Sequence, residues 1–404
     1  MTAATKTITN TKKGYNINHF YLSLMILWRA LQGTIMTFDS GGRTTLFLTL
    51  IVFFLNLRNK NFREIAFGAP CIIWLLWVIF SATNVLIQGY HVTEIPYSFF
   101  VIQRLFAPYV VLVIAAFEYA RNRNLFLKVM LYSFLLYSII GFYFMDNYYV
   151  AQQEGRDANN SLGNLLAINA VFIIFFAALL NNFKELNQKK LYLFIVFSFF
   201  IIIASATRKA VGAASIIYIS LVLSQIKLNL TNLIKLGVII FVISFTFNFV
   251  MENTFLGERF VEEAEKEIYT GNNPFLKLVG DRAMNYIEGY EIFLDNPLFG
   301  IGVKNYTHYT HSTHVLHTEY MVQMCEHGLV GLVLFILFYS TIIYQQLKVK
   351  AVNSKFKSSK FIMLGAIAAI LFMGITAWIY DFAFYYAVIG TVVGNIYYSK
   401  KVTQ

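Results

Sequence analysis

The sequence predicts an all-α polytopic membrane protein with about twelve transmembrane helices and one large extracytoplasmic loop. Of its 404 residues, 58% are hydrophobic and only 13% are charged, about half of the roughly 25% found in soluble proteins. The apolar residues form long continuous runs, many of them near the roughly 20 residues that a helix needs to cross a bilayer. A soluble domain cannot bury this much apolar surface, disorder requires low hydrophobicity, and a membrane barrel would show short alternating strands.

The apolar runs predict where the chain crosses the membrane. We expect spans near residues 18–38, 44–57, 66–87, 96–118, 127–144, 162–180, 191–206, 210–226, 234–251, 316–345, 361–380 and 382–398. Several of these runs are short, and the stretch 191–226 could form one long helix. We treat residues 1–404 as a single membrane domain, in which 18–251 holds the first nine spans, 252–315 the large extracytoplasmic loop and 316–398 the last three spans.

The basic residues predict the orientation of these spans. An even number of spans places both termini on one side, and we assign that side to the cytoplasm. The inner segments then hold 21 of the 32 Lys and Arg residues, whereas the short outer loops hold only Arg43, Arg156, Arg208 and Lys209. Cytoplasmic loops are enriched in Lys and Arg. The net charge of +11 is therefore a topology signal, and we expect no nucleic-acid partner.

The segment 252–315 differs from the other outer loops in length and charge. It carries ten acidic and five basic residues, whereas the inner loops are basic. Apolar residues recur in it at helical spacing, at Ala283, Tyr286, Tyr290, Phe293 and Leu294. This spacing predicts an amphipathic helix. Asn296-Pro297 should end that helix, and Gly300 and Gly302 mark a tight turn.

Cations on the outer side are the first candidates for chemistry. Arg208 and Lys209 interrupt the apolar stretch at an outer turn, where an anionic lipid head group or a diphosphate would balance their charge. A solvated turn between two helices is the alternative. Arg282 opens the amphipathic helix just after Asp281, and a surface ion pair of those two residues is the plain alternative.

Four histidines lie three residues apart, at His308, His311, His314 and His317. Such a ladder suggests zinc, but each step of three residues on a helix turns about 60° away from the starting face. The four rings cannot converge on one ion if they are helical, so we expect no metal and no cofactor. A single histidine that acts as a general base is more economical.

Three charged residues, Arg29, Arg104 and Asp381, lie within or at the ends of the expected spans. A charge there is costly, so each should line a cleft or form an intramembrane pair. Both readings stay open.

Three sequence blocks resemble the bacterial O-antigen ligase and O-antigen polymerase family. The run from His317 to Tyr320, with Glu326, Gly328 and Gly331, resembles the signature H-N-x-Y-L … E-x-G-x-x-G. The block from Arg282 and Tyr286 through Asp295-Asn296-Pro297 to Asn305 resembles the outer-loop block, and Thr207-Arg208-Lys209-Ala210 resembles the S/T-R-x-A turn. Together the blocks cover roughly residues 200–335. The chain departs from the pattern at Thr318, Met321 and Lys209, where the family has Asn, Leu and a small residue.

The resemblance implies a twelve-helix, metal-independent, inverting glycosyltransferase in the bacterial inner membrane, with a mobile outer loop and an active site that faces the periplasm. Its donor would be an undecaprenyl-diphosphate-linked oligosaccharide. The resemblance assigns His317 to activation of the acceptor, and Arg208 and Arg282 to the diphosphate. We expect further support for this site from Lys209, His314, Glu326, Tyr286 and Arg104.

The acceptor remains open between two choices. A polymerase transfers the glycan to another lipid-linked repeat unit, and a ligase transfers it to the lipopolysaccharide core. We favour the polymerase, which a chain-length regulator protein could serve as a partner, because the acidic loop is a poor surface for a phosphate-rich core. A lipid-linked oligosaccharide flippase is a remote alternative, since transporters usually show internal repeats and broken spans, whereas this chain has five prolines and no evident repeat.

Overall fold

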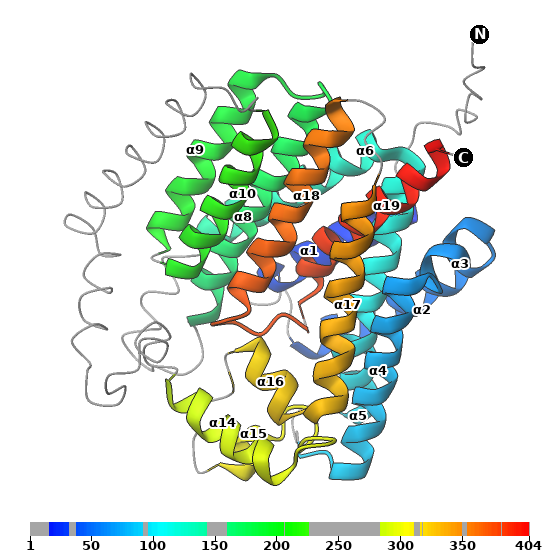
Figure 1. Ribbon diagram of the computed structural model, residues 1–404, viewed down its shortest axis with the longest axis vertical. Helices are drawn as coiled ribbons and strands as arrows, with labels where there is room; N and C mark the ends of the chain where they lie inside the picture. The colour runs from blue at the N-terminus through cyan, green and yellow to red at the C-terminus, as the bar shows by residue number, and fades with distance from the viewer. Residues whose placement is uncertain are drawn as a thin grey trace.

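The computed structural model describes residues 16–31, 38–91, 96–143, 160–205, 207–225, 283–310, 316, 318–349, 354–380 and 382–403. Within these ranges the chain is helical and contains no strand. Long helices pack side by side, and helices α14, α15 and α16 gather at one end of the bundle (Figure 1). The C-terminal end of α19 points toward the other end (Figure 1).

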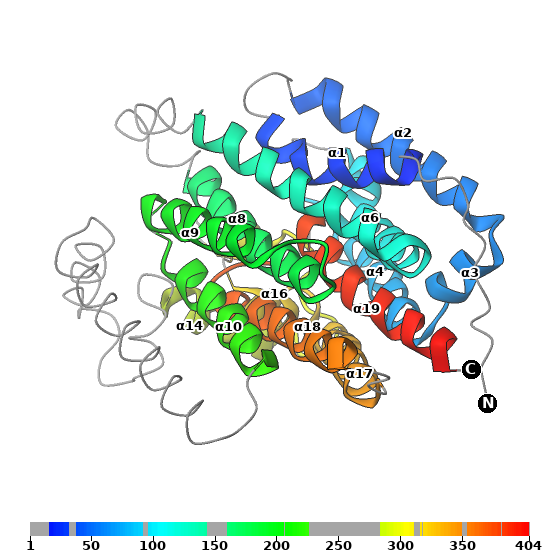
Figure 2. The ribbon, with the colours of Figure 1, turned by 90° about the horizontal axis from the view of Figure 1, so that it is seen from above.

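The helices that the structure describes follow one another along the chain in this order: α1 (Ile17–Leu31), α2 (Phe38–Leu57), α3 (Lys60–Ala66), α4 (Ala69–Gln88), α5 (Tyr97–Phe100), the π-helical η1 (Val101–Phe106), α6 (Ala107–Tyr143), α8 (Asn160–Asn182), α9 (Gln188–Ala204), α10 (Arg208–Gln225), α14 (Ala283–Asp295), α15 (Tyr306–Tyr309), α16 (Glu319–Cys325), α17 (Gly328–Lys348), α18 (Ser354–Met373) and α19 (Ala383–Thr403). Seen from above, α1 and α2 cover one flank beside α6, and α10, α18 and α17 form the opposite flank (Figure 2).

Four helical stretches in the described part of the chain are long and apolar enough to cross a membrane: Ala69–Gln88, Val101–Tyr143, Leu165–Asn182 and Gly328–Lys348. Shorter apolar helices cover Ile17–Trp28, Thr45–Leu57 and Lys209–Ser224. The described residues are therefore all-helical, as predicted, and include four candidate membrane-spanning stretches. The count of twelve spans stays a prediction, because the expected span 234–251 and much of the loop 252–315 lie outside the described residues.

The stretch Val101–Tyr143 contains a break at Asn122. Its 43 residues, at about 1.5 Å each, would make a straight helix about twice as long as the roughly 30 Å hydrocarbon core. Asn122 has φ −147° and ψ 76°, which is not helical. The break falls between the predicted spans 96–118 and 127–144, so two helical stretches replace one overlong helix.

Other expected boundaries differ from the observed ones. The predicted span 316–345 is divided into α16 and α17, because Gly328 takes a φ of +64° that an α-helix does not allow. The predicted span 361–380 ends early, since α18 stops at Met373. The stretch 191–226 forms two helices, α9 and α10, and not one. The helix predicted around Ala283–Leu294 is confirmed as α14, which stops just before Asn296-Pro297.

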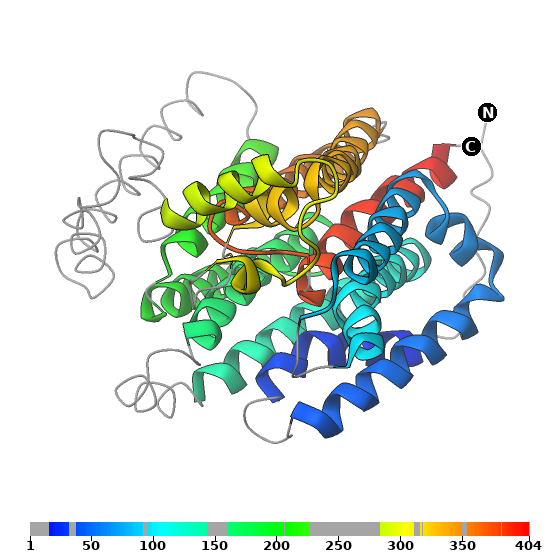
Figure 3. The same cartoon turned by 90° about the horizontal axis from the view of Figure 1, so that it is seen from below.

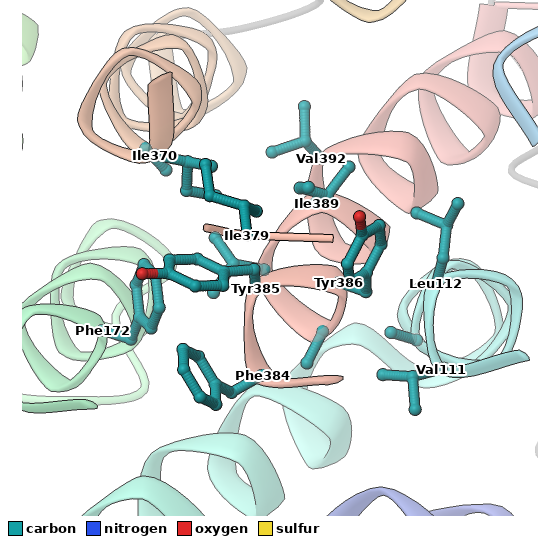
Figure 4. Packing of buried hydrophobic residues seen from close by; sticks show 14 of the residues in the cluster. Val111, Leu112, Phe172, Ile370, Ile379, Phe384, Tyr385, Tyr386, Ile389 and Val392 are labelled. Carbon is teal, nitrogen blue, oxygen red and sulfur yellow. The ribbon is translucent and has the colours of Figure 1, made fainter. Parts of the chain in front are cut away.

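Helix α19 packs closely against α6 through two glycines. A Cβ atom on Gly390 would lie 2.4 Å from the carbonyl oxygen of Leu112, and one on Gly394 would lie 2.7 Å from that of Ala116. Small residues spaced four apart let helix backbones approach in membranes, where packing rather than hydrophobic transfer drives association. Around this contact, Tyr385 lies beside Phe172 of α8, and Val111 and Leu112 of α6 lie on the other side of α19 (Figure 4).

Replacing Gly390 by Val should weaken this contact, because the added methyl groups have no room beside the Leu112 carbonyl. Overpacking of this kind typically costs about 1–3 kcal/mol, and we expect a lower melting temperature for the detergent-purified protein. Ala368→Val adds volume on an exposed face of α18 and serves as the control. Equal melting temperatures for both variants would contradict the proposed close packing.

Candidate functional site

Several of the predicted site residues, or their side chains, lie outside the described part of the structure, next to residues that are described. Arg208 is the first residue of α10, and its side chain lies outside the described part, as do Arg282, His314 and His317. Arg29 has only its backbone described, and Asp381 lies outside as well. The residues beside these positions are described, and they define the surroundings of the site.

Two of these neighbouring side chains contact one segment of the chain. We call residues 374–380, which join α18 to α19, the connecting segment. It lies at the end of the bundle that carries α14 and α16 (Figure 3). Lys209 Nζ donates to the carbonyl oxygen of Thr376 at 3.4 Å. The hydroxyl of Tyr286, on α14, donates to the carbonyl oxygen of Ile375 at 2.6 Å.

The start of α16 contacts the same segment through its backbone. The N–H of Glu319 donates to the carbonyl oxygens of Gly374 at 2.9 Å and Ala377 at 3.1 Å. The hydroxyl of Thr318, which caps α16, donates to the Tyr286 hydroxyl at 3.0 Å. The starts of α10 and α16 and the helix α14 therefore meet on consecutive carbonyl groups of the connecting segment.

The side chain of Glu319 fixes the other half of the connecting segment. It is fully buried, and its Oε2 accepts hydrogen bonds from the backbone N–H groups of Ile379 and Tyr380. Its Oε1 accepts from Gln323 Nε2 at 2.7 Å. Gln323 Oε1 in turn accepts from the indole N–H of Trp77, in α4, at 2.8 Å. The carboxylate thus joins α16, the connecting segment and α4.

Lys304 brings a further cation to the connecting segment. Its Nζ lies 3.8 Å from the centre of the Trp378 ring and 5.3 Å from that of Tyr380. These are cation–π distances. Lys304 has a φ of +62°, which is uncommon for a residue with a Cβ atom. Sequence reasoning missed Lys304, because it occupies an unspecified position between Gly302 and Asn305 of the outer-loop block.

The two glycine motifs of the family resemblance form a pair of interlocked turns. Residues 297–302 and 325–330 exchange backbone hydrogen bonds, including those from Ile301 N to Cys325 O at 3.0 Å and from Leu329 N to Pro297 O at 2.8 Å. Gly300 and Gly328 meet at the centre with φ of +67° and +64°. A Cβ on Gly328 would lie 2.5 Å from the Gly300 nitrogen. Both positions therefore require glycine.

Two further supporting residues, Glu326 and Arg104, are described. Glu326 is buried, and its carbonyl accepts from the Gly302 N–H at 2.9 Å, so its backbone belongs to the interlocked turns. Arg104 is half-buried in η1, near Tyr90. Burial raises the pKa of Tyr90 above its usual value, and the nearby charge of Arg104 opposes part of this rise.

Three histidines near these turns, His91, His308 and His327, are described in full. His308 is exposed on α15, and its ring stacks on that of His91 at 3.8 Å. His327 is buried beside Trp77, and burial lowers its pKa below the usual value. Within the described ranges, no group of three or more His, Cys, Asp or Glu residues could hold a metal ion. The expectation of no metal at the histidine ladder stays a prediction, since His311, His314 and His317 are not described.

Fold and site define a helical membrane protein in which several separate segments meet on one connecting segment at one end of the bundle. Residues 193–336 match the family model described as O-antigen ligase. This range contains Arg208, Arg282 and His317, so the resemblance of the chain to the O-antigen polymerase and ligase family is confirmed there. The family supports a membrane glycosyltransferase at the level of enzyme class. No curated protein matches the chain.

Replacing Gly328 by Ala should disrupt the interlocked turns, because the new methyl group would meet backbone atoms of Leu298 and Gly300. The left-handed φ adds strain of about 1 kcal/mol or more for a residue with a Cβ atom. We expect faster cleavage within residues 297–302 and 325–330 in limited proteolysis. Gly289→Ala is the control, since its methyl group would meet side-chain atoms alone, the nearest being the flexible tip of Met321 at 3.1 Å. A Gly328→Ala variant as resistant as the control would contradict this account.

Proposed function

We propose that this chain is a metal-independent, inverting glycosyltransferase that polymerises O-antigen or related repeat units from an undecaprenyl-diphosphate donor. It would act at the outer face of the bacterial inner membrane, with both termini in the cytoplasm and α14–α16 toward the periplasm. One observation carries the proposal. Lys209, Tyr286 and Glu319 all hydrogen-bond to carbonyl groups of residues 374–377.

Covalent connectivity links this observation to the three proposed site residues. Arg208 adjoins Lys209, and His317 adjoins Thr318, which contacts Tyr286. Arg282 precedes Tyr286 by only four residues, and an extended chain covers at most about 3.6 Å per residue. The residues proposed to bind the diphosphate and to activate the acceptor are therefore close in sequence to residues that contact the connecting segment or one another.

The residue types fit the proposed reaction. The acceptor hydroxyl loses a proton as its oxygen attacks the anomeric carbon, and His317 would take that proton, a contribution of typically about 10²–10⁴-fold. The bond from the anomeric carbon to the lipid diphosphate breaks, and the leaving group gains negative charge. Guanidinium groups bind phosphate oxygens bidentately and stay protonated, so Arg208 and Arg282 would supply the charge that a metal supplies elsewhere. Attack opposite the leaving group inverts the anomeric centre.

Two lysines add positive charge at the same place. The ammonium of Lys209 rests on the Thr376 carbonyl, and that of Lys304 rests on the Trp378 ring. Lys209 is a departure from the family pattern, which has a small residue there. Lys304 occupies a position that the pattern leaves unspecified. They support an anionic substrate beside the connecting segment.

The ligase remains the second candidate, because the matching family model is described as O-antigen ligase. The acidic segment 252–315, with ten acidic and five basic residues, favours the polymerase, since a phosphate-rich core would be repelled by it. A flippase would bind the same lipid-linked glycan, but it would make no new glycosidic bond.

The chain lengths of the surface glycan in a deletion strain separate these candidates. Loss of long chains, with one repeat unit still attached to the core, means polymerase. Loss of all decoration means ligase. Unchanged glycan transfer in detergent extracts of the deletion strain would rule out both enzymes.

His317→Ala should abolish glycan transfer, because no other group would take the acceptor proton. The protein should accumulate in the membrane at the normal level, and transfer is measured by gel profiles of the glycan. His308→Ala is the matched control, since the side chain of His308 is exposed and its ring stacks on that of His91. Normal polymer from His317→Ala, together with its loss in His311→Ala or His314→Ala, would identify a different base.

Arg208→Lys and Arg282→Lys should each reduce turnover by roughly ten- to a hundredfold, because lysine keeps the charge but loses the planar fork that binds two phosphate oxygens. Initial rates with lipid-diphosphate donor measure this effect. Arg63→Lys, at an exposed position of α3, should leave the rate unchanged. If both site variants turn over like Arg63→Lys, the diphosphate is bound elsewhere.

A further inference from the structure

We propose that Glu319 is a positioning residue of the transfer reaction, which holds the connecting segment in register with the start of α16; this inference rests on the proposed glycosyltransferase function. Glu319 follows the proposed base His317 by two residues. The family signature leaves its position unspecified, so the resemblance assigns it no role. The contacts of Glu319 with residues 374–380 suggest a positioning role for it.

Glu319 binds the connecting segment through both its backbone and its side chain. Its backbone N–H donates to the carbonyl oxygens of Gly374 and Ala377, and its carboxylate accepts from the N–H groups of Ile379 and Tyr380. The segment therefore wraps around a single residue. Any shift of the segment along the chain would break bonds at both of its ends at once.

The surrounding groups require an acceptor at both carboxylate oxygens. The indole N–H of Trp77 can only donate, so it fixes the Gln323 amide with its oxygen toward Trp77 and its NH₂ toward Glu319. Oε1 of Glu319 therefore faces a donor, and Oε2 faces two backbone donors. An amide at position 319 has one acceptor and one donor end, so it cannot satisfy both sides. Turning over the Gln323 amide would only move the conflict to Trp77.

This register matters for the proposed chemistry because the other anchors sit on the same segment. Lys209, beside Arg208, rests on Thr376, and Tyr286, shortly after Arg282, rests on Ile375. A segment that slips relative to Glu319 would carry these anchors away from His317. Misplacement by a small distance lowers the rate of the chemical step more than it weakens binding.

The hydrogen-bond pattern suggests a reciprocal exchange as the test. In Glu319→Gln alone, one donor faces another donor. In the double variant Glu319→Gln/Gln323→Glu, the amide at position 319 can accept from Ile379 and Tyr380 and donate to the new carboxylate at position 323. That carboxylate still accepts from Trp77. Every bond of the original arrangement is restored with the same net charge.

The assay uses full-length protein in detergent and lipid-linked oligosaccharide extracted from the deletion strain, which should accumulate unused donor. We expect Glu319→Gln to lower kcat by about ten- to a hundredfold, with KM for the donor within about threefold of the wild-type value. The double variant should recover kcat to within about threefold, together with the wild-type melting temperature. Glu64→Gln, at an exposed position of α3, controls for the loss of a carboxylate.

Three results would overturn the inference. Wild-type kcat in Glu319→Gln would mean that the register does not need the carboxylate. A double variant that melts like the wild type but stays as slow as Glu319→Gln would mean that the Glu319 carboxylate acts in the chemistry itself. A double variant that fails to accumulate would contradict the hydrogen-bond arrangement. If the wild-type protein itself transfers no glycan, the proposed function fails, and that outcome is distinct from all three.

Discussion

One buried carboxylate, that of Glu319, joins three parts of the chain at the end of the bundle that carries α14 and α16. Moving a carboxylate out of water costs several kcal/mol, roughly, unless hydrogen bonds replace the lost hydration. Glu319 receives such bonds from Ile379, Tyr380 and Gln323, and two of these donors are backbone groups that have left the helix. The bonds therefore solve two problems together, because the N–H groups of a non-helical segment inside a membrane protein also need acceptors.

In the interlocked turns, non-helical backbone groups also find hydrogen-bond partners, and here glycines rather than a carboxylate make this possible. Backbone groups of residues 297–302 and 325–330 pair with one another, which is possible only because Gly300 and Gly328 permit a very close approach. Asn84, in α4, adds its amide to the Phe299 carbonyl at 2.6 Å. The irregular backbone of these turns is thus satisfied by other backbone groups and by a buried amide.

The sequence predicted those features that depend on local patterns. Long apolar runs predicted the helical membrane class, and helical spacing with Pro297 predicted α14 and its end. The division of the predicted span 316–345 was missed, because a glycine in an apolar run carries no sign of a left-handed φ. The connecting segment was missed for a different reason. All of its residues fall within the predicted apolar span 361–380, and its role arises from contacts such as that of Trp77 with Gln323, which are 246 residues apart.

A second buried carboxylate at the other end of the bundle clarifies what is particular about Glu319. Glu118, in α6, accepts from Asn18 Nδ2 at 2.6 Å and Asn16 Nδ2 at 3.2 Å, and it lies 3.4 Å from the guanidinium of Arg121. These partners are side chains on α6 or at the start of α1, so Glu118 joins preformed helices. Glu319 instead binds backbone N–H groups of the connecting segment, those of Ile379 and Tyr380, which lie beyond the last turn bonds of α18 from Ile375 N to Phe372 O and from Thr376 N to Met373 O. A carboxylate used in this way determines the course of the chain, and the carbonyl groups that the segment turns toward α10, α14 and α16 follow from it.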